Sequence, residues 1–129
     1  MLKTRMCAAV CLLGICGCGG VGHDDLIKEQ IRSIDEAAAI LEGVKDADSA
    51  RAARPKLLKI ALDMKQQNAR ARKLAPTSAE DLARITAKNE QASQAALGRL
   101  NDAARRAADL PGCHDVVAEF NGELNRLIH

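Results

Sequence analysis

The fold of this chain is decided by residues 77–110, TSAEDLARITAKNEQASQAALGRLNDAARRAADL. Apolar or small side chains recur there every three or four residues, which is the period of one face of an α-helix. This face comprises Leu82, Ile85, Asn89, Ala92, Ala96, Leu100, Ala103, Ala107 and Leu110. Thr77 and Glu80 have the spacing of a capping box, with Thr77 as the N-cap. We therefore predict a helix over residues 78–109, which at ~1.5 Å per residue would be about 45–50 Å long.

The same periodicity extends along the chain on both sides of this stretch. It predicts helices over residues 25–43 and 47–74 upstream, and over residues 114–128 downstream. The first seam comprises Ile27, Ile31, Ile34, Ala38 and Leu41, and the second comprises Ala53, Leu57, Ile60, Met64, Gln67, Ala71 and Leu74. The last seam comprises Val117, Phe120, Leu124 and either Leu127 or Ile128. Because no segment alternates at a period of two over a useful length, we expect no sheet.

A few residues indicate where these helices begin, bend and end. Asp24 or Asp25 is expected to cap the first helix. Pro55 removes one backbone hydrogen bond, so it should either kink the second helix or mark its first turn. Ala75-Pro76 leaves only a short turn between the second and third helices. We therefore expect these two helices to form an antiparallel hairpin.

The seams also predict how the helices pack. The fold class is all-α, an antiparallel helical hairpin or a three- to four-helix bundle with coiled-coil-like seams. Residues 24–45 carry six acidic and three basic side chains, whereas residues 46–74 carry eight basic and three acidic ones, so the first helix should lie beside the second. Gln67 and Asn89 lie on the seams and should make buried polar contacts that fix the register. Alanine-rich seams bury little area, so we expect a thin core, modest stability and help from self-association.

The first residues of the chain have the three-part pattern of an export signal. Two basic side chains precede an apolar run from Met6 to about Cys16, and small residues follow. A run of about a dozen residues is too short to cross a bilayer as a helix, which takes about 20. We predict a cleaved signal peptide over residues 1–17, a flexible glycine-rich tether over residues 18–23 and a helical domain over residues 24–129.

The end of this segment, Ile15-Cys16-Gly17-Cys18, resembles the lipobox of bacterial lipoproteins. An aliphatic residue stands three positions before the final cysteine and a small residue directly before it, although Cys16 occupies a position where Ala or Ser is commoner. The resemblance implies that diacylglycerol is attached to Cys18 through a thioether and that the chain is cleaved between Gly17 and Cys18. Plain secretion and an uncleaved anchor are the alternatives.

The helical body carries a second resemblance, which is one of architecture. Residues 44–57, VKDADSARAARPKL, and residues 76–80, PTSAE, are similar to segments of short alanine-rich lipoproteins of unknown function from planctomycete-type bacteria. This resemblance supplies no catalytic residue to transfer.

Charge and aromatic content argue against nucleic-acid binding. The formal net charge is +2, but Lys3 and Arg5 would leave with the signal, and no acidic residue precedes Asp24. Of the 19 basic side chains 17 would remain against 17 acidic ones, so the processed chain has no global field that attracts polyanions. Phe120 is the only aromatic residue, which leaves bases and sugar rings without a stacking platform. We expect no nucleic-acid partner.

Cys113 and His114 are the only candidates for chemistry in the body of the chain. They could ligate a metal or act as nucleophile and base, but sequence neighbours rarely orient toward each other. None of the histidines, His23, His114 and His129, has a second ligand at helical spacing. We interpret Cys113 as a spare thiol, free or in an intermolecular disulfide, and the histidines as tail or loop residues. Without a carboxylate pair, triad or nucleotide signature, we expect no catalytic residue, metal, cofactor or enzyme activity.

Basic residues cluster toward the end of the second predicted helix. They are Lys65, Arg70, Arg72 and Lys73. The preferred interpretation is a solvated helix face that pairs with the acidic first helix. Contact with anionic lipid headgroups or with an acidic partner is the alternative.

The sequence therefore predicts a small lipoprotein held at the inner or outer membrane of a bacterium through Cys18, with its domain in the periplasm or outside the cell. Its expected role is a structural or protein-interaction module of the cell envelope, with an envelope protein or a second copy as partner. The alternative is a periplasm-facing protein that binds a small ligand or a metal through Cys113, His114 or its alanine-lined interior.

Overall fold

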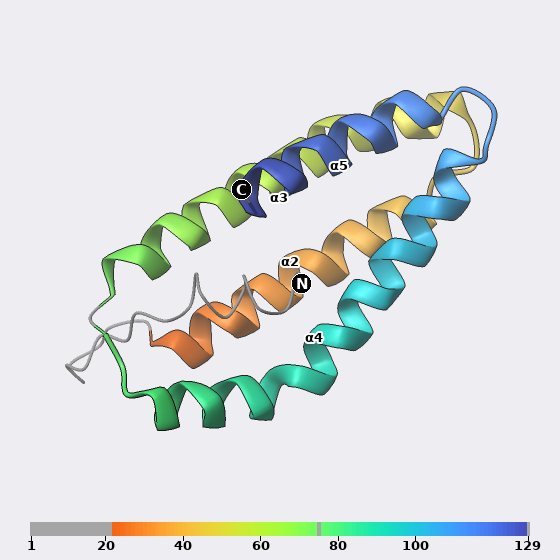
Figure 1. Cartoon of the computed structure of the whole chain (residues 1–129). Helices are drawn as coiled ribbons and strands as arrows, with labels where there is room; N and C mark the ends of the chain where they lie inside the picture. The colour runs from red at the N-terminus through yellow and green to blue at the C-terminus, as the bar shows by residue number, and fades with distance from the viewer. Residues whose placement is uncertain (1–21, 75, 129) are drawn as a thin grey trace.

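The computed structural model describes residues 22–74 and 76–128, which form four helices and no strand (Figure 1). The helices are α2 (His23–Glu42), α3 (Ala47–Lys73), α4 (Ala79–Ala108) and α5 (His114–Ile128). They pack against one another, so the predicted all-α bundle is confirmed. Each helix begins and ends within two residues of its predicted bounds. In the described part of the chain, no helix is long and apolar enough to cross a membrane.

The four helices form two hairpins that lie side by side. A turn at residues 43–46 joins α2 to α3, and a turn at residues 109–113 joins α4 to α5. The hairpins point the same way, so α2 runs parallel to α4 and α3 runs parallel to α5 (Figure 1). Arg99 of α4 fixes the first of these pairs through ion pairs of 2.7 Å to Glu42 and 3.6 Å to Asp35.

α2 lies between α3 and α4 (Figure 1). Its most extensive interface is with α4 and the next is with α3, so the expected contact of the first two helices is confirmed. We expected α3 and α4 to pack on each other as a hairpin. They do run in opposite directions, but the expected packing is wrong, because each of them packs on α2 instead (Figure 1). The reason is the width of the apolar surface of α2, where the successive residues Ala37 and Ala38 are both fully buried.

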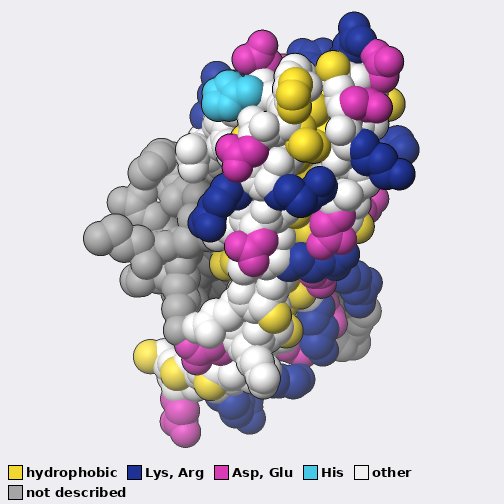
Figure 2. Space-filling view, turned by 90° about the vertical axis from the view of Figure 1, so that its right-hand side faces the viewer, with side chains coloured by type: hydrophobic (Ala, Val, Ile, Leu, Met, Phe, Trp, Pro, Cys, Tyr) yellow, Lys and Arg dark blue, Asp and Glu magenta, His cyan; other side chains and the backbone are white. Residues whose placement is uncertain are grey.

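One end of the bundle, which we call the closed end, contains both inter-helix turns. Its core is apolar and comprises the buried residues Leu41, Val44, Ala107, Cys113, Val117 and Phe120. Gly112 has a φ of +75°, and a Cβ there would lie 2.9 Å from Cβ of Ala47, so the close approach of the two turns requires glycine. Seen from this end, basic and acidic side chains are interspersed with small apolar patches over the surface (Figure 2).

Arg106 of α4 closes the C-terminal end of α2. Its guanidinium donates hydrogen bonds to the carbonyl oxygens of Leu41 at 2.8 Å, Glu42 at 3.0 Å and Val44 at 3.2 Å. The last carbonyls of a helix have no partner within the helix, so an arginine from a neighbouring helix satisfies them and complements the helix dipole. The seam pattern gave no sign of this role.

The opposite end, which we call the open end, contains the start of α2, the last turns of α3 and the first turns of α4 (Figure 1). Leu26 and Ile27 are buried there, and polar contacts between the helices add to this packing. Gln67 Nε2 donates to Ser33 Oγ at 3.0 Å, and Asn89 Nδ2 donates to Asp24 Oδ1 at 2.7 Å. Gln67 and Asn89 are both buried, so the buried polar contacts predicted for the seams are confirmed.

The first turns of α4 are less buried than their seam predicted. Leu82 and Ile85 are half-buried, and Ala92 is exposed. α2 begins at His23, at the level of Asn89 on α4, so the earlier turns of α4 extend beyond the start of α2 and have little of it to pack against.

Two helix starts differ from the prediction. α2 begins at His23 with Gly22 as its N-cap, so His23 belongs to the helix and not to the tether, and neither Asp24 nor Asp25 is the cap. Asp25 instead accepts a hydrogen bond from the Gly22 backbone N–H at 3.3 Å. The helix starts early because the fully buried His23 packs in its first turn.

The cap of α4 is shifted by one residue from the predicted capping box. Ser78, not Thr77, is the N-cap, and its hydroxyl accepts from the backbone N–H of Asp81 at 3.1 Å. The same hydroxyl donates to the Asp81 carboxylate at 3.0 Å, so Asp81 takes the place expected for Glu80. Two overlapping Ser/Thr-x-x-acid patterns occur here, and the carboxylate of the second is also held by a neighbouring arginine.

α3 is continuous through Pro55, which is exposed. The proline is therefore not the first turn of a restarted helix. The first turn of α3 lies upstream and is capped by Asp46, whose carboxylate accepts a hydrogen bond from the Ser49 backbone N–H at 2.8 Å.

Candidate interaction surface

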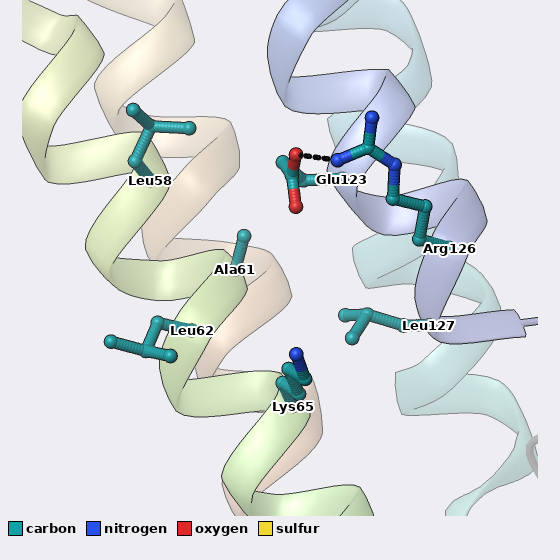
Figure 3. Close-up of a pocket in the computed structure, with 7 residues that line it drawn as sticks. All are labelled: Leu58, Ala61, Leu62, Lys65, Glu123, Arg126 and Leu127. Atoms are coloured by element: carbon teal, nitrogen blue, oxygen red, sulfur yellow. Dashed lines mark hydrogen bonds and ion pairs between the residues drawn. The ribbon is translucent and has the colours of Figure 1, made fainter.

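A groove of about 360 Å³ lies between the middle of α3 and the last turns of α5 (Figure 3). Seven residues line it: Leu58, Ala61, Leu62, Lys65, Glu123, Arg126 and Leu127. Leu62 has 54% of its surface exposed and is the one large hydrophobic side chain in the described residues that is exposed. A groove with an apolar floor at such a side chain is a candidate contact surface for another molecule.

Charged side chains of both signs border this groove. Lys65 extends from α3, and Glu123 and Arg126 extend from α5 (Figure 3). Glu123 forms an ion pair with Arg126 on its own helix, whereas Lys65 has no ion pair among the described residues. The rim therefore has a cation on the α3 side and an ion pair on the α5 side.

The groove exists because α5 is held along α3 in parallel. Arg54 of α3 donates two hydrogen bonds to the Glu119 carboxylate of α5, at 2.6 and 2.8 Å. These hydrogen bonds raise the pKa of Arg54 and lower the pKa of Glu119, as expected for a bidentate pair. Phe120, which is 1% exposed, anchors the same helix in the core. The two contacts fix the register that brings Leu127 opposite Leu62.

One feature of the sequence points to the apolar side of this groove. Leu58 and Leu62 lie off the main seam of α3, four residues apart, and so form a short second apolar stripe. The sequence could not indicate that α5 would border this stripe.

The predicted lipid-attachment and cleavage residues, Cys18 and Gly17, lie outside the described residues. The signal peptide of residues 1–17 also lies outside them, as does His129.

Cys113 and His114 are not brought together. Cys113 is fully buried in the core, and its Sγ lies 3.6 Å from the carbonyl oxygen of Pro111. His114 is exposed at the start of α5. The interpretation of Cys113 as a thiol available for an intermolecular disulfide is corrected, because a fully buried sulfur cannot reach a second chain without local unfolding. Within residues 22–74 and 76–128, no three His, Cys, Asp or Glu side chains are grouped to hold a metal ion.

His23 was expected in a tail but is fully buried. Neither of its ring nitrogens has a hydrogen-bond partner among the described residues. Burial disfavours the charged imidazolium and lowers the pKa of His23 to about 4. The side chain is therefore neutral at physiological pH.

The basic cluster at the end of α3 is only partly paired with α2. Arg70 forms an ion pair with Glu29, as the preferred interpretation predicted. Lys65, Arg72 and Lys73 are exposed and have no ion pair within the described part of the chain. All four residues are therefore solvated, but only Arg70 pairs with α2.

No protein-family model, no curated protein and no solved structure matches this chain. The candidate surface rests on the geometry of the groove alone.

Proposed function

We propose that this protein is a lipid-anchored structural module of the bacterial cell envelope, which is held at a membrane through Cys18 and associates with a second copy of itself through the groove between α3 and α5. The N-terminal pattern of basic residues, apolar run and lipobox supports the anchor. The exposure of Leu62 beside this groove is the observation that carries the association.

A second copy would bring an equivalent exposed Leu62 to the groove. Interfaces between two identical copies are usually two-fold, so a patch must complement itself. A two-fold axis near Leu62 would place the two leucines together. Complete burial of a leucine contributes about 1.5–3 kcal/mol. The processed chain would carry equal numbers of acidic and basic side chains, so no net repulsion opposes pairing.

The anchor is tested by palmitate labelling of the full-length protein in a bacterial host. We expect the label to be lost in Cys18→Ala and retained in the matched control Cys16→Ala, where alanine suits the lipobox pattern. Labelling that survives Cys18→Ala would disprove the anchor.

The association is tested by single-cysteine crosslinking in the native membrane. Because Cys113 is fully buried, a cysteine placed at Leu62 would be the accessible thiol of the described domain. Under mild oxidation, we expect Leu62→Cys to form a disulfide-linked dimer. The control Ala52→Cys places the thiol at an exposed position of the same helix away from the groove, and should stay monomeric. A crosslink to a different envelope protein, or equal dimer formation in both variants, would rule out the second copy as the occupant.

A further inference from the structure

The last turns of α3 present cations that the bundle itself does not neutralise. Lys65, Arg72 and Lys73 are exposed and have no ion pair among the described residues. Arg70, which lies between them, is already paired with Glu29 of α2. The three remaining cations are therefore available to an external anion.

Most acidic side chains near these cations are already engaged. Asp24 Oδ2 lies 2.7 Å from Nζ of Lys28 and 3.1 Å from Nζ of Lys88. Hydrogen bonds from Lys28 and then Asn89 hold the pKa of Asp24 well below its usual range. Asp81 is paired with Arg84 at 2.7 Å.

Two further carboxylates, those of Asp25 and Glu80, have no ion pair within the described residues. Asp24 neutralises only one of its two lysines. Residues 65–73 of α3 carry four basic side chains and no acidic one, so the positive charge of the open end is concentrated on α3.

The predicted tether places this same end next to the membrane. Four residues lie between Cys18 and His23, the first residue of α2, which makes five Cα–Cα steps. At about 3.3–3.6 Å per extended residue they span at most about 18 Å. α2 then runs from the open end toward the closed end over 20 residues, or about 30 Å. A lipid on Cys18 therefore keeps the open end near the bilayer and lets the closed end extend away from it.

We infer that the open end of the bundle docks on the bilayer surface and that Lys65, Arg72 and Lys73 bind the headgroups of anionic phospholipids. This inference rests on the proposed anchor at Cys18. Each basic side chain near an anionic surface strengthens binding about fivefold, and the effect falls as salt screens it. Three such contacts are too few to recruit the protein from solution, but they suffice to orient a domain that the lipid already holds at the surface.

The test uses the processed lipoprotein reconstituted in vesicles of phosphatidylcholine alone or with phosphatidylglycerol. Amide hydrogen exchange over residues 65–74 and 79–88 reports contact of the open end with the bilayer. We expect exchange there to slow at least about fivefold in the anionic vesicles, and the slowing to disappear in high salt. The turns of the closed end should exchange equally in both kinds of vesicle.

A pair of matched double variants isolates the charge. Arg72→Gln with Lys73→Gln should abolish the difference between the two vesicles, whereas Arg51→Gln with Lys56→Gln, exposed positions on the same helix near the closed end, should retain it. Equal exchange in both vesicles by the wild-type lipoprotein, or slowing at the closed end, would overturn the inference while leaving the anchor intact. Failure of the anchor is recognised separately, because Cys18 would then take up no palmitate.

Discussion

The closed and open ends of the bundle share α2, α3 and α4 but are held by different forces. At the closed end, two turns meet over buried apolar side chains, with Leu41 and Cys113 fully enclosed and Phe120 1% exposed. At the open end, the buried side chains include Gln30, Gln67, Asn89 and His23. Leu26 and Ile27 of α2 are also buried there, but they do not belong to the main apolar core, and the first leucine of α4 is only half-buried.

This difference implies that the closed end provides most of the stability, whereas the open end sets how the helices are aligned. Apolar burial is strong and non-directional, so the closed end should supply most of the free energy of folding. A hydrogen bond adds only about 1 kcal/mol, but its geometry is specific, so contacts such as Gln30 Nε2 to Asn68 Oδ1 at 2.7 Å set the register of α2. Gln30 Oε1 and Gln67 Oε1 are buried without a partner in the described residues, and such atoms cost about 1–3 kcal/mol each. We expect the open end to unfold locally before the closed end.

The largest effect should come from the same substitution made at both ends. Leu41→Ala removes a fully buried side chain at the closed end and should lower the free energy of unfolding by about 2–5 kcal/mol. Leu82→Ala at the open end removes a half-buried side chain and should cost about 1 kcal/mol or less. Urea unfolding followed by circular dichroism measures both. Equal losses of unfolding free energy in the two variants would contradict the proposed difference between the two ends.

The second effect is a pH dependence that belongs to the open end. The pKa of His23 is lowered to about 4 in the folded protein and returns to its ordinary value of 6.5 on unfolding. The stabilisation is fully present above pH 6.5 and is lost as pH falls from 6.5 toward 4, on the order of 3 kcal/mol. Denaturant unfolding at several pH values should show a shallower dependence in His23→Gln than in the wild type. The exposed-histidine control His114→Gln should keep the wild-type slope, and a parallel loss in both variants would refute the assignment.

A third effect separates two adjacent arginines of α4. Arg106→Ala removes charge-assisted hydrogen bonds to three carbonyls at the end of α2 and should lower the free energy of unfolding by about 1.5–3 kcal/mol. Arg105→Ala changes an exposed neighbour and should stay within about 0.5 kcal/mol of the wild type. Thermal unfolding of the two variants measures the contrast. If Arg105→Ala lowered the free energy of unfolding as much as Arg106→Ala, the hydrogen bonds from Arg106 to the end of α2 would not be what stabilises the closed end.

The smallest effects concern two glycines and should differ in sign. Gly112→Ala places a Cβ at positive φ and 2.9 Å from Ala47, so it should destabilise the closed end by about 1–2 kcal/mol. A Cβ at Gly98, within α4, would meet nothing within 4 Å, so Gly98→Ala should stabilise the protein by about 0.5–1 kcal/mol. Differential scanning calorimetry should show melting temperatures on opposite sides of the wild type. Shifts of the same sign would contradict the tight contact of the two turns.

The sequence by itself determined the helices. Their periodicity and caps are local, because hydrogen bonds within a helix span four residues and a cap acts within one turn. The predicted start of α3 at residue 47 agrees with its cap at Asp46, whereas the predicted cap of α4 at Thr77 is wrong by one residue because a second Ser/Thr-x-x-acid pattern begins at Ser78. The burial of Gln67 and Asn89 also followed from their place on the seams.

The opposite charges of α2 and α3 predicted their contact, but only the tertiary structure decided how the other helices face one another. Alanine-rich seams are alike, so a pattern of burial does not name its partner, and the short turn after Leu74 suggested a packing of α3 with α4 that α2 replaces. The groove depends on the same kind of information, because Leu62 and Leu127 come together only when Arg54 and Glu119 align two helices far apart in the sequence. Local interactions fix each helix, whereas the choice among similar apolar faces depends on the combined packing of all four.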